Sequence, residues 1–379
     1  MDDILISDYS LENISTNFKS LVAVDNNRIL GYKNGIIYLF NKKENTFQKI
    51  VKLPQSLFWR MCSNIRICER TFRMEPRFAI KLDNDKYLIS YRGAIYRVSL
   101  SEKDIIIEHK YINGMNNPLH PCKIQGLEGF DDGVYYGEYT GNLDKSSVSV
   151  YKRNANTGIW KPVFSFNRGQ INHIHNIVPD YINQQMLILT GDTDSASGIW
   201  SAKENFSTVE PLLIGKQEYR SCSLFPVEQG FIYATDAPLD TNYIFHSKLI
   251  KGKWKTKKLY ELQGSVIYSI ENNGFYYFST TVEPDSNIKG KRFLITNKLG
   301  LGIKDRNVNV IAGNLDEGFR VIIKYRKDIY PMGLCQFGAV HFTNLKENQV
   351  ILHPIAVKDV ENNLIILKRD NRNDKYRKI

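Results

Sequence analysis

The segment Gly133-Val134-Tyr135-Tyr136-Gly137-Glu138 is one copy of a pattern that recurs along nearly the whole chain. Turn residues lead into a short aromatic or β-branched run, and a second turn leads into another apolar run. The other copies begin at Arg28, Lys86, Gln185, Gly230 and Gly274, with a weaker one at Gln336-Phe337-Gly338-Ala339-Val340. Their spacing, roughly 45 to 60 residues, is the length of a four-stranded propeller blade with its loops. The pattern predicts an all-β protein, a seven-bladed β-propeller. Six or eight blades are the alternatives, because the ends of the chain are weakly patterned.

Glycine-containing turns support this prediction within the repeats. Asn34-Gly35 and Arg92-Gly93 each separate two apolar runs, which is a strong signal for a β-hairpin. Helical periodicity is not sustained over a dozen residues anywhere in the sequence. We therefore expect a single propeller domain over residues 1–367, followed by a basic C-terminal tail at 368–379.

Composition and charge narrow the classes of function. The 379 residues are 42% hydrophobic and 24% charged, as in ordinary soluble proteins. The formal net charge of +11 indicates an affinity for anions. No nucleic-acid-binding motif accompanies it, so nucleic acid is not expected as a partner.

The ends of the sequence and its cysteines indicate a location. The start, Met1-Asp2-Asp3-Ile4-Leu5, is acidic and has no long apolar run behind it, unlike a signal peptide. No stretch approaches the roughly 18 apolar residues of a membrane span. Five scattered cysteines without a CxxC pair fit a reducing environment, so we expect a cytoplasmic protein.

Polar residues gather at the edges of strand-like runs between residues 173 and 242. His173 and His175 alternate on one run, Asp192 follows Thr190-Gly191 at the end of the next, and Arg220 and Asp236 occupy comparable places in the following repeat. Residues at equivalent places in successive blades converge, so a site is expected here. The histidines allow three roles, as metal ligands, as a general base with its partner, or as hydrogen-bonding packing residues. The aspartates have turn capping as their alternative.

Further candidates lie outside this group. Arginine is suited to carboxylates because its planar fork donates two parallel hydrogen bonds, which points to Arg66, Arg73 and Arg220. Glu138 follows Tyr136 at the end of an apolar run. Each of these residues has a structural alternative, as a solvated arginine or a surface residue beside a turn. Asn242 and Trp200 complete the set, with blade packing as the alternative for Trp200.

The segment from Ile199 to Phe206 resembles a degenerate Asp-box of the sialidase-type (BNR) propellers, in which a Ser-x-Asp-x-Gly-x-Thr-Trp turn joins the outer strands of a blade. Ser201 and an aromatic residue remain, while Lys203 and Asn205 stand at the Asp and Gly positions. The wider pattern, from His-x-His to Thr-Asp-Ala-Pro, looks like sialidase-like propellers found with bacterial surface-polysaccharide genes. The resemblance covers about Tyr136 to Asn242, and the rest of the chain only by its repeat rhythm.

The resemblance implies an acidic glycan as substrate, because sialidases hold a carboxylate with three arginines. A tyrosine paired with a glutamate is their nucleophile, whereas a tyrosine or histidine near an arginine could abstract a proton in a uronate lyase. The expected catalytic residues are His173, His175, Glu138, Asp192 and Asp236; the expected substrate-binding residues are Arg66, Arg73, Arg220, Tyr136, Asn242 and Trp200. No residue is assigned to a metal, and no motif requires a cofactor.

Two functions remain open on these grounds. The first is a carbohydrate-active propeller, a glycoside hydrolase or polysaccharide lyase acting on an acidic bacterial oligosaccharide or polysaccharide. The second is a non-catalytic propeller that binds glycan or protein in polysaccharide assembly. The sequence lacks a GxGxxG fingerprint, a Walker A loop, an HExxH helix and a GxSxG elbow, which argues against nucleotide-dependent chemistry and serine hydrolysis. It does not indicate an oligomeric state.

Overall fold

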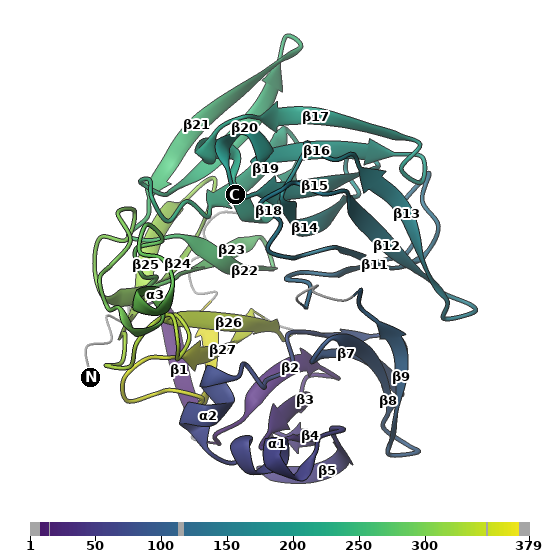
Figure 1. The fold of residues 1–379 in the computed structure, drawn as a ribbon, viewed down its shortest axis with the longest axis vertical. Helices are drawn as coiled ribbons and strands as arrows, with labels where there is room; N and C mark the ends of the chain where they lie inside the picture. The colour runs from purple at the N-terminus through teal and green to yellow at the C-terminus, as the bar shows by residue number, and fades with distance from the viewer. Residues whose placement is uncertain (1–7, 15, 113–116, 346–347, 371–379) are drawn as a thin grey trace. The chain divides into compact units, whose positions relative to one another are not determined.

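The computed structural model describes residues 8–14, 16–112, 117–345 and 348–370. Over this part of the chain, strands β1 to β28 form seven four-stranded antiparallel sheets (Figure 1). Seven such sheets make a seven-bladed β-propeller, so the predicted fold is confirmed. The α-helices of the described residues are short: α1 (Leu57–Cys62), α2 (Arg66–Thr71) and α3 (Lys291–Ile295). None of them has the length and apolar character needed to cross a bilayer.

Contacts within the chain divide it into two compact units. Unit 1 comprises Met1–Glu75 and Leu262–Ile379, and unit 2 comprises Pro76–Glu261. Three of the sheets belong to unit 1 and four to unit 2. The single domain expected over residues 1–367 stays a prediction.

Unit 2 is built from four consecutive meanders, each with its strands paired in chain order. The sheets are β6 (Ala79–Lys81), β7 (Lys86–Tyr91), β8 (Ala94–Ser99) and β9 (Asp104–Lys110); β10 (Cys122–Ile124), β11 (Gly133–Gly137), β12 (Val148–Asn154) and β13 (Trp160–Phe166); β14 (His173–Asp180), β15 (Gln185–Gly191), β16 (Gly198–Lys203) and β17 (Thr208–Ile214); and β18 (Ser221–Val227), β19 (Gly230–Thr235), β20 (Tyr243–Ile250) and β21 (Lys253–Glu261).

Unit 1 contains two meanders and one sheet closed by the N-terminal strand. The sheets are β2 (Lys19–Ala23), β3 (Arg28–Lys33), β4 (Ile36–Asn41) and β5 (Thr46–Lys52); β22 (Val266–Asn272), β23 (Phe275–Thr280), β24 (Asn307–Asn314) and β25 (Gly318–Arg326); and β26 (Ala339–Asn344), β27 (Gln349–Ile355), β28 (Leu364–Arg369) and β1 (Tyr9–Ile14).

Six of the seven sequence copies mark the second strand of a sheet, namely β3, β7, β11, β15, β19 and β23. These strands are apolar because neighbours cover both of their faces, as in β15, where Met186 to Gly191 are all buried. Two hairpin turns are also confirmed. Asn34-Gly35 joins β3 to β4 and Arg92-Gly93 joins β7 to β8, each with both residues at positive φ, as a type I′ turn requires.

The seventh copy lies in the remaining sheet but marks a different strand. Residues 336–340 lead into β26, the first strand of its sheet, whereas the second strand is β27. This sheet takes its fourth strand from the N-terminus, since β1 pairs antiparallel with β28 from Tyr9↔Arg369 to Ile14↔Leu364. Strand β28 includes Lys368 and Arg369, so the expected basic tail begins within a strand. Residues 371–379 of that tail lie outside the described residues.

Arg66 and Glu69 of helix α2 belong to an ionic cluster in unit 1. Glu75 Oε2 lies 3.2 Å from Lys19 Nζ, and Glu75 Oε1 pairs with Arg66, which also contacts Glu69 at 2.8 Å and Glu361 at 3.2 Å. Burial by itself raises the pKa of Glu75, but the charges of Arg66 and Lys19 outweigh it and hold this pKa well below its ordinary value. Glu75 is therefore ionised in the folded protein.

His353 of β27 should make the protein sensitive to acid. It is fully buried, and burial lowers its pKa to about 3. As the pH falls below about 6.5, the unfolded chain takes up this proton first, so stability is complete above that pH and declines toward pH 3. His353 alone is expected to cost about 2 kcal/mol of stability between pH 7.5 and pH 5.

Urea unfolding of wild type and His353→Leu at both pH values measures this contribution. The variant should lose less stability on acidification than wild type does. His341→Gln is the matched control, because His341 faces His353 across β26 and β27 but is only half-buried. An equal loss of stability in wild type and His353→Leu would contradict the prediction.

Candidate functional site

Unit 2 brings five of the predicted site residues into one group, which we call the histidine cluster: His173, His175, Asp192, Arg220 and Asp236. They come from two neighbouring sheets whose first strands, β14 and β18, contact each other. Each sheet contributes an aspartate from the equivalent position. Asp192 directly follows the second strand β15, and Asp236 directly follows the second strand β19. The repeat thus places two carboxylates at equivalent positions.

Two β-bulges direct side chains into this group. In β14, Ile174 pairs with Thr190 and Asn176 with Leu189, which leaves His175 as the extra residue. In β18, Ser221 pairs with Thr235 and Ser223 with Ala234, which leaves Cys222 as the extra residue. A bulge re-aims its side chain and is common beside active sites. It places the His175 ring and the Cys222 thiol in the same part of unit 2.

The two imidazoles are held by backbone carbonyls. His173 Nδ1 lies 2.9 Å from the oxygen of Thr140, and His175 Nδ1 lies 3.1 Å from the oxygen of Ser221. A carbonyl oxygen only accepts hydrogen bonds, so each Nδ1 carries the donated proton. The remaining nitrogens, the two Nε2 atoms, lie 2.9 Å apart. Both rings therefore turn their Nε2 atoms toward the same point.

Asp192 joins the histidines to the arginine. Its Oδ1 atom lies 3.5 Å from His173 Nε2, 3.6 Å from His175 Nε2 and 2.8 Å from Arg220 Nη2. Arg220 Nη2 also lies 3.6 Å from Asp236 Oδ2, and Arg220 Nη1 donates to the backbone oxygen of Asp192 at 3.0 Å. The Asp192 side chain is 48% exposed, whereas both histidines are buried, so solvent reaches the cluster at Asp192.

The surroundings fix the charges of this group. Burial would raise the pKa of Asp192, but the contacts with His173 and His175 and the charge of Arg220 outweigh it and hold that pKa well below its usual range. Burial lowers the pKa of His175 to about 4. At neutral pH, Asp192 is therefore a carboxylate and His175 an uncharged imidazole.

Two neighbours were missing from the predicted set. The Tyr139 ring lies 4.4 Å from the His173 ring between centroids, and burial raises the pKa of its hydroxyl. Cys222 Sγ donates to Asp236 Oδ2 at 3.5 Å, and burial also raises the pKa of this thiol. Tyr139 could have been found from the sequence, because it directly follows the predicted residue Glu138. Cys222 could not, because no local sequence pattern marks the bulge that turns it inward.

Glycine is required at position 191 because the His175 ring lies directly against its backbone. A Cβ atom at this position would lie 2.4 Å from Cε1 of His175, a distance that real side chains do not adopt. Asn172, just before β14, braces the loop after Gly191, since its Oδ1 accepts from the backbone nitrogens of Asp192 at 3.1 Å and Thr193 at 3.3 Å. The Thr190-Gly191-Asp192 motif thus positions Asp192 against the rings.

Glu138 and Tyr136 have contacts of their own in unit 2. Glu138 Oε2 accepts from the backbone nitrogen of Ser149 at 2.7 Å, and burial raises the pKa of this carboxyl. Tyr136 stacks on Tyr151, and its hydroxyl lies 2.7 Å from His109 Nε2. These contacts explain the two residues as packed parts of the sheets, and their predicted site roles stay predictions.

Trp200 and Asn242 also serve local structure. Trp200 Nε1 donates to Thr190 Oγ1 at 3.1 Å, and its ring packs edge-on against Phe166. Asn242 is fully buried and closes the loop after β19, accepting from the nitrogen of Ala237 and donating to its oxygen, both at 2.9 Å. No contact in the described residues points either side chain to a ligand.

The other two predicted arginines belong to unit 1. Arg66 pairs with the three carboxylates of the ionic cluster. Arg73 has a positive φ of 48° and lies over the ring of Phe337, 6.0 Å from its centroid. Both have structural contacts within their own unit, and their role in substrate binding stays a prediction.

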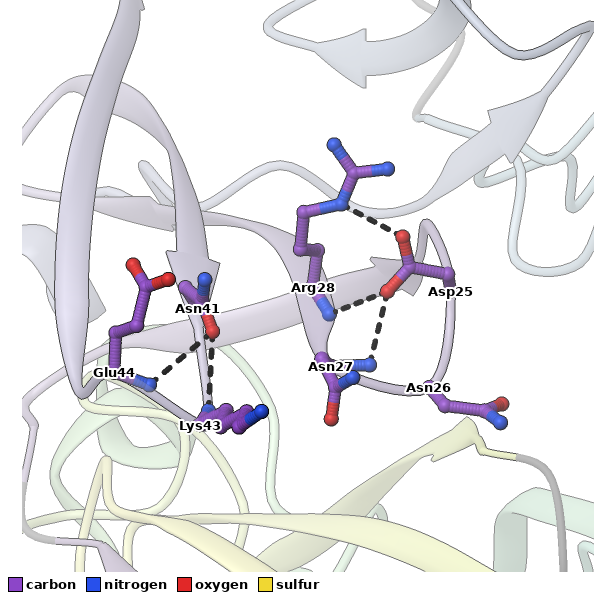
Figure 2. A pocket seen from close by; sticks show the side chains of 7 residues that line it. All are labelled: Asp25, Asn26, Asn27, Arg28, Asn41, Lys43 and Glu44. Atoms are coloured by element: carbon purple, nitrogen blue, oxygen red, sulfur yellow. Dashed lines mark hydrogen bonds and ion pairs between the residues drawn. The ribbon is translucent and has the colours of Figure 1, made fainter.

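A polar pocket in unit 1 is formed by the β2–β3 and β4–β5 turns (Figure 2). Asp25 accepts from the backbone nitrogens of Asn27 and Arg28, both at 2.9 Å, and from Arg28 Nε at 2.7 Å. Asn41 caps the second turn by accepting from Lys43 and Glu44. These bonds close the two turns, which accounts for the polar lining without a ligand.

The histidine cluster contains two groups of atoms suited to a cation. One consists of His173, His175 and Asp192, and the other of His175, Cys222 and Asp236, with the ligand atoms of each group within 4.8 Å of one another. The cluster also combines an ionised carboxylate, a fixed guanidinium and uncharged imidazole. It can therefore bind an anionic group, hold a cation or move a proton.

The sequence matches no protein family model and no curated protein. Solved structures are similar over most of the chain. An oligogalacturonate lyase in complex with manganese has 8% identity and a TM-score of 0.53, covering 97% of this chain and 92% of its own. The WD40 β-propeller domain of Doa1 has 12% identity and a TM-score of 0.54, covering 96% and 98%.

A third similar structure is the extracellular domain of a putative hybrid two-component system from B. thetaiotaomicron. It has 12% identity and a TM-score of 0.53, covering 97% of this chain and 39% of its own. These comparisons show the fold alone. The turn after β16, where the degenerate Asp-box was expected, does join the third and fourth strands of its sheet. Membership of the sialidase-like class is not confirmed.

Proposed function

We propose that this protein is a carbohydrate-active propeller that acts on an acidic glycan at the histidine cluster. The observation that carries the proposal is the convergence of two imidazoles, two carboxylates and a guanidinium from adjacent sheets, with solvent access at Asp192. Burying such groups together costs stability unless they satisfy one another fully, and groups of this kind are concentrated at functional sites. The similarity to an oligogalacturonate lyase supports a carboxylated sugar as the substrate class.

The charge of the protein favours an anionic ligand. The chain carries a formal net charge of +11, which attracts acidic oligosaccharides at long range. Within the cluster, Arg220 is the fixed positive charge, and it is only slightly exposed, so its charge acts in a poorly screened environment. A sugar carboxylate reaching the cluster would meet Arg220 together with the two aspartates that pair with it.

The chemistry of the cluster favours elimination over hydrolysis. A glycosidase needs one protonated carboxylic acid to assist the leaving group. Asp192 is held ionised, with Arg220 among the groups that stabilise its charged form. A uronate lyase instead needs a positive charge that neutralises the substrate carboxylate and a base that removes the neighbouring proton. Arg220 is the candidate for that positive charge, although Asp192 and Asp236 offset it in the unbound cluster.

A substrate panel tests the proposal with the purified full chain. Oligogalacturonates, other uronate oligosaccharides and sialylated oligosaccharides would be incubated with the protein, with and without divalent metal. Ultraviolet absorbance of unsaturated uronate reports elimination, and new reducing ends without that absorbance report hydrolysis. We expect elimination from a uronate oligosaccharide. Binding without turnover would favour the non-catalytic propeller, and neither binding nor turnover on any acidic glycan would overturn the proposal.

A further inference from the structure

The two Nε2 atoms of the histidine cluster face each other at a point that suits a positive charge. Both Nδ1 atoms donate to carbonyl oxygens, so in the neutral rings each Nε2 bears a lone pair. At 2.9 Å these lone pairs repel one another. A shared proton or a bound cation relieves the repulsion, and Asp192 Oδ1, at 3.5 and 3.6 Å from the two nitrogens, faces the same point.

We propose that His173, His175 and Asp192 bind one divalent first-row transition-metal ion, such as Zn²⁺ or Mn²⁺. Its further role, to receive the carboxylate of the sugar, rests on the proposed function. The sequence carries no metal motif beyond His-x-His, and the third ligand becomes visible only in the fold. The proposal therefore departs from the sequence-based assignment of no metal.

The distances within the triad fit such an ion. Metal–nitrogen and metal–oxygen bonds of about 2.1 Å place neighbouring ligand atoms about 3.0 to 3.4 Å apart in octahedral or tetrahedral geometry. The three observed distances, 2.9, 3.5 and 3.6 Å, bracket that range. Two imidazoles and one carboxylate suit borderline transition metals, whereas Ca²⁺ and Mg²⁺ prefer oxygen ligands throughout.

The surroundings have the features of a metal site's outer shell. Each imidazole donates its other nitrogen proton to a backbone carbonyl, which fixes the tautomer and the ring orientation. Arg220 holds Asp192 through both its side chain and its backbone oxygen. Asp192, Asp236 and Arg220 together carry one net negative charge. A divalent ion would reverse that sign and make the cluster attractive to a carboxylate.

Access allows the ion to contact substrate. The two histidines are buried, whereas the Asp192 side chain is 48% exposed. An ion held by three protein ligands keeps coordination positions for water or substrate, and here those positions would face the solvent side of Asp192. This arrangement is typical of catalytic rather than structural metal sites.

Isothermal titration calorimetry tests the site on the full chain after dialysis against a chelator. Zn²⁺ and Mn²⁺ are the probes, and Mg²⁺ is the comparison ion. We expect one Zn²⁺ or Mn²⁺ per chain with a Kd in the micromolar range or tighter, and much weaker Mg²⁺ binding. His175→Gln and Asp192→Asn should each raise the Kd by at least about tenfold, because each removes a ligand and the loss of a residue that only supports a ligand already costs about that much.

Matched variants control for nonspecific effects. Asp194→Asn makes the same change two residues from Asp192, and His341→Gln changes a histidine of unit 1; both should bind the ion like wild type. Because Asp192 is half exposed, Asp192→Asn should keep the wild-type circular dichroism spectrum even if His175→Gln does not fold. Electron paramagnetic resonance of bound Mn²⁺ gives a second readout of binding.

Metal binding and catalysis can fail separately. If wild type binds neither Zn²⁺ nor Mn²⁺, or if Asp192→Asn and a folded His175→Gln bind as wild type does, the metal site is overturned. Turnover of an acidic glycan that survives exhaustive chelation would overturn the site's catalytic part but leave the proposed function intact. Tight binding at the triad without turnover of any acidic glycan would instead support the site and overturn the proposed function.

Discussion

Asp192→Asn is expected to turn over a uronate oligosaccharide about 10²- to 10⁴-fold more slowly than wild type, the range for losing a charged catalytic group. Asp192 Oδ1 is the atom that contacts His173, His175 and Arg220 at once. Asparagine keeps the shape but removes the negative charge that orients all three. The measurement is kcat and kcat/KM on the oligosaccharide that wild type eliminates fastest.

The control for this variant is Asp194→Asn. Asp194 lies on the same loop, is exposed, and accepts from Gln217 Nε2 at 2.9 Å rather than from the histidine cluster. It should retain wild-type turnover. A similar loss in both variants would show that the loop as a whole matters rather than the Asp192 carboxylate. Unchanged turnover in Asp192→Asn would remove Asp192 from the catalytic set.

Glu75→Gln is expected to lower the free energy of unfolding by about 3–5 kcal/mol, the cost of breaking a buried ion pair by removing one partner. The Glu75 side chain is only 4% exposed and pairs with both Lys19 and Arg66. The variant removes the carboxylate that pairs with the buried Lys19 ammonium, which is also one of the three carboxylates that contact Arg66. Denaturant unfolding at neutral pH, followed by circular dichroism, measures the loss.

The pH dependence gives an independent check on Glu75. Its pKa in the folded protein is depressed, so its contribution to stability is present above the unfolded value near 4.5 and is lost as the pH falls. The difference in stability between wild type and Glu75→Gln should therefore shrink on acidification. Glu44→Gln, at an exposed turn, is the control and should change stability by no more than about 0.5 kcal/mol. A constant difference across the pH range would argue against the ion pairs as its origin.

The fold could be predicted because its signals are local. The second strand of a sheet is covered on both faces, as β15 is, so its sequence is an apolar run. A type I′ hairpin needs residues that tolerate positive φ, as at Asn34-Gly35. The weaker seventh copy shows the limit of this signal, because it marks the first strand of its sheet rather than the second. Strand β1 pairs with β28, which lies at the other end of the chain, and no local sequence pattern predicts such a distant pairing.

The candidate site was predictable in part for the same reason. Asp192 and Asp236 both follow the second strand of a sheet, so the repeat alone places them at equivalent positions. Tyr136 and Trp200 were selected on the same kind of signal, yet each has packing and hydrogen-bond partners in the sheets that explain it. A residue's type and its place beside a strand do not reveal which neighbours it meets.

The sequence by itself determined the strand count of each blade, the hairpin turns and the positions from which polar side chains leave the sheets, because these depend on residues a few places apart. Only the tertiary structure decided which of those side chains meet. The bulges at His175 and Cys222, the open space that Gly191 leaves for an imidazole, and the 2.9 Å approach of two Nε2 atoms all arise between strands. Such contacts depend on sheet register and on packing between neighbouring sheets, which bring together residues that the chain order keeps apart.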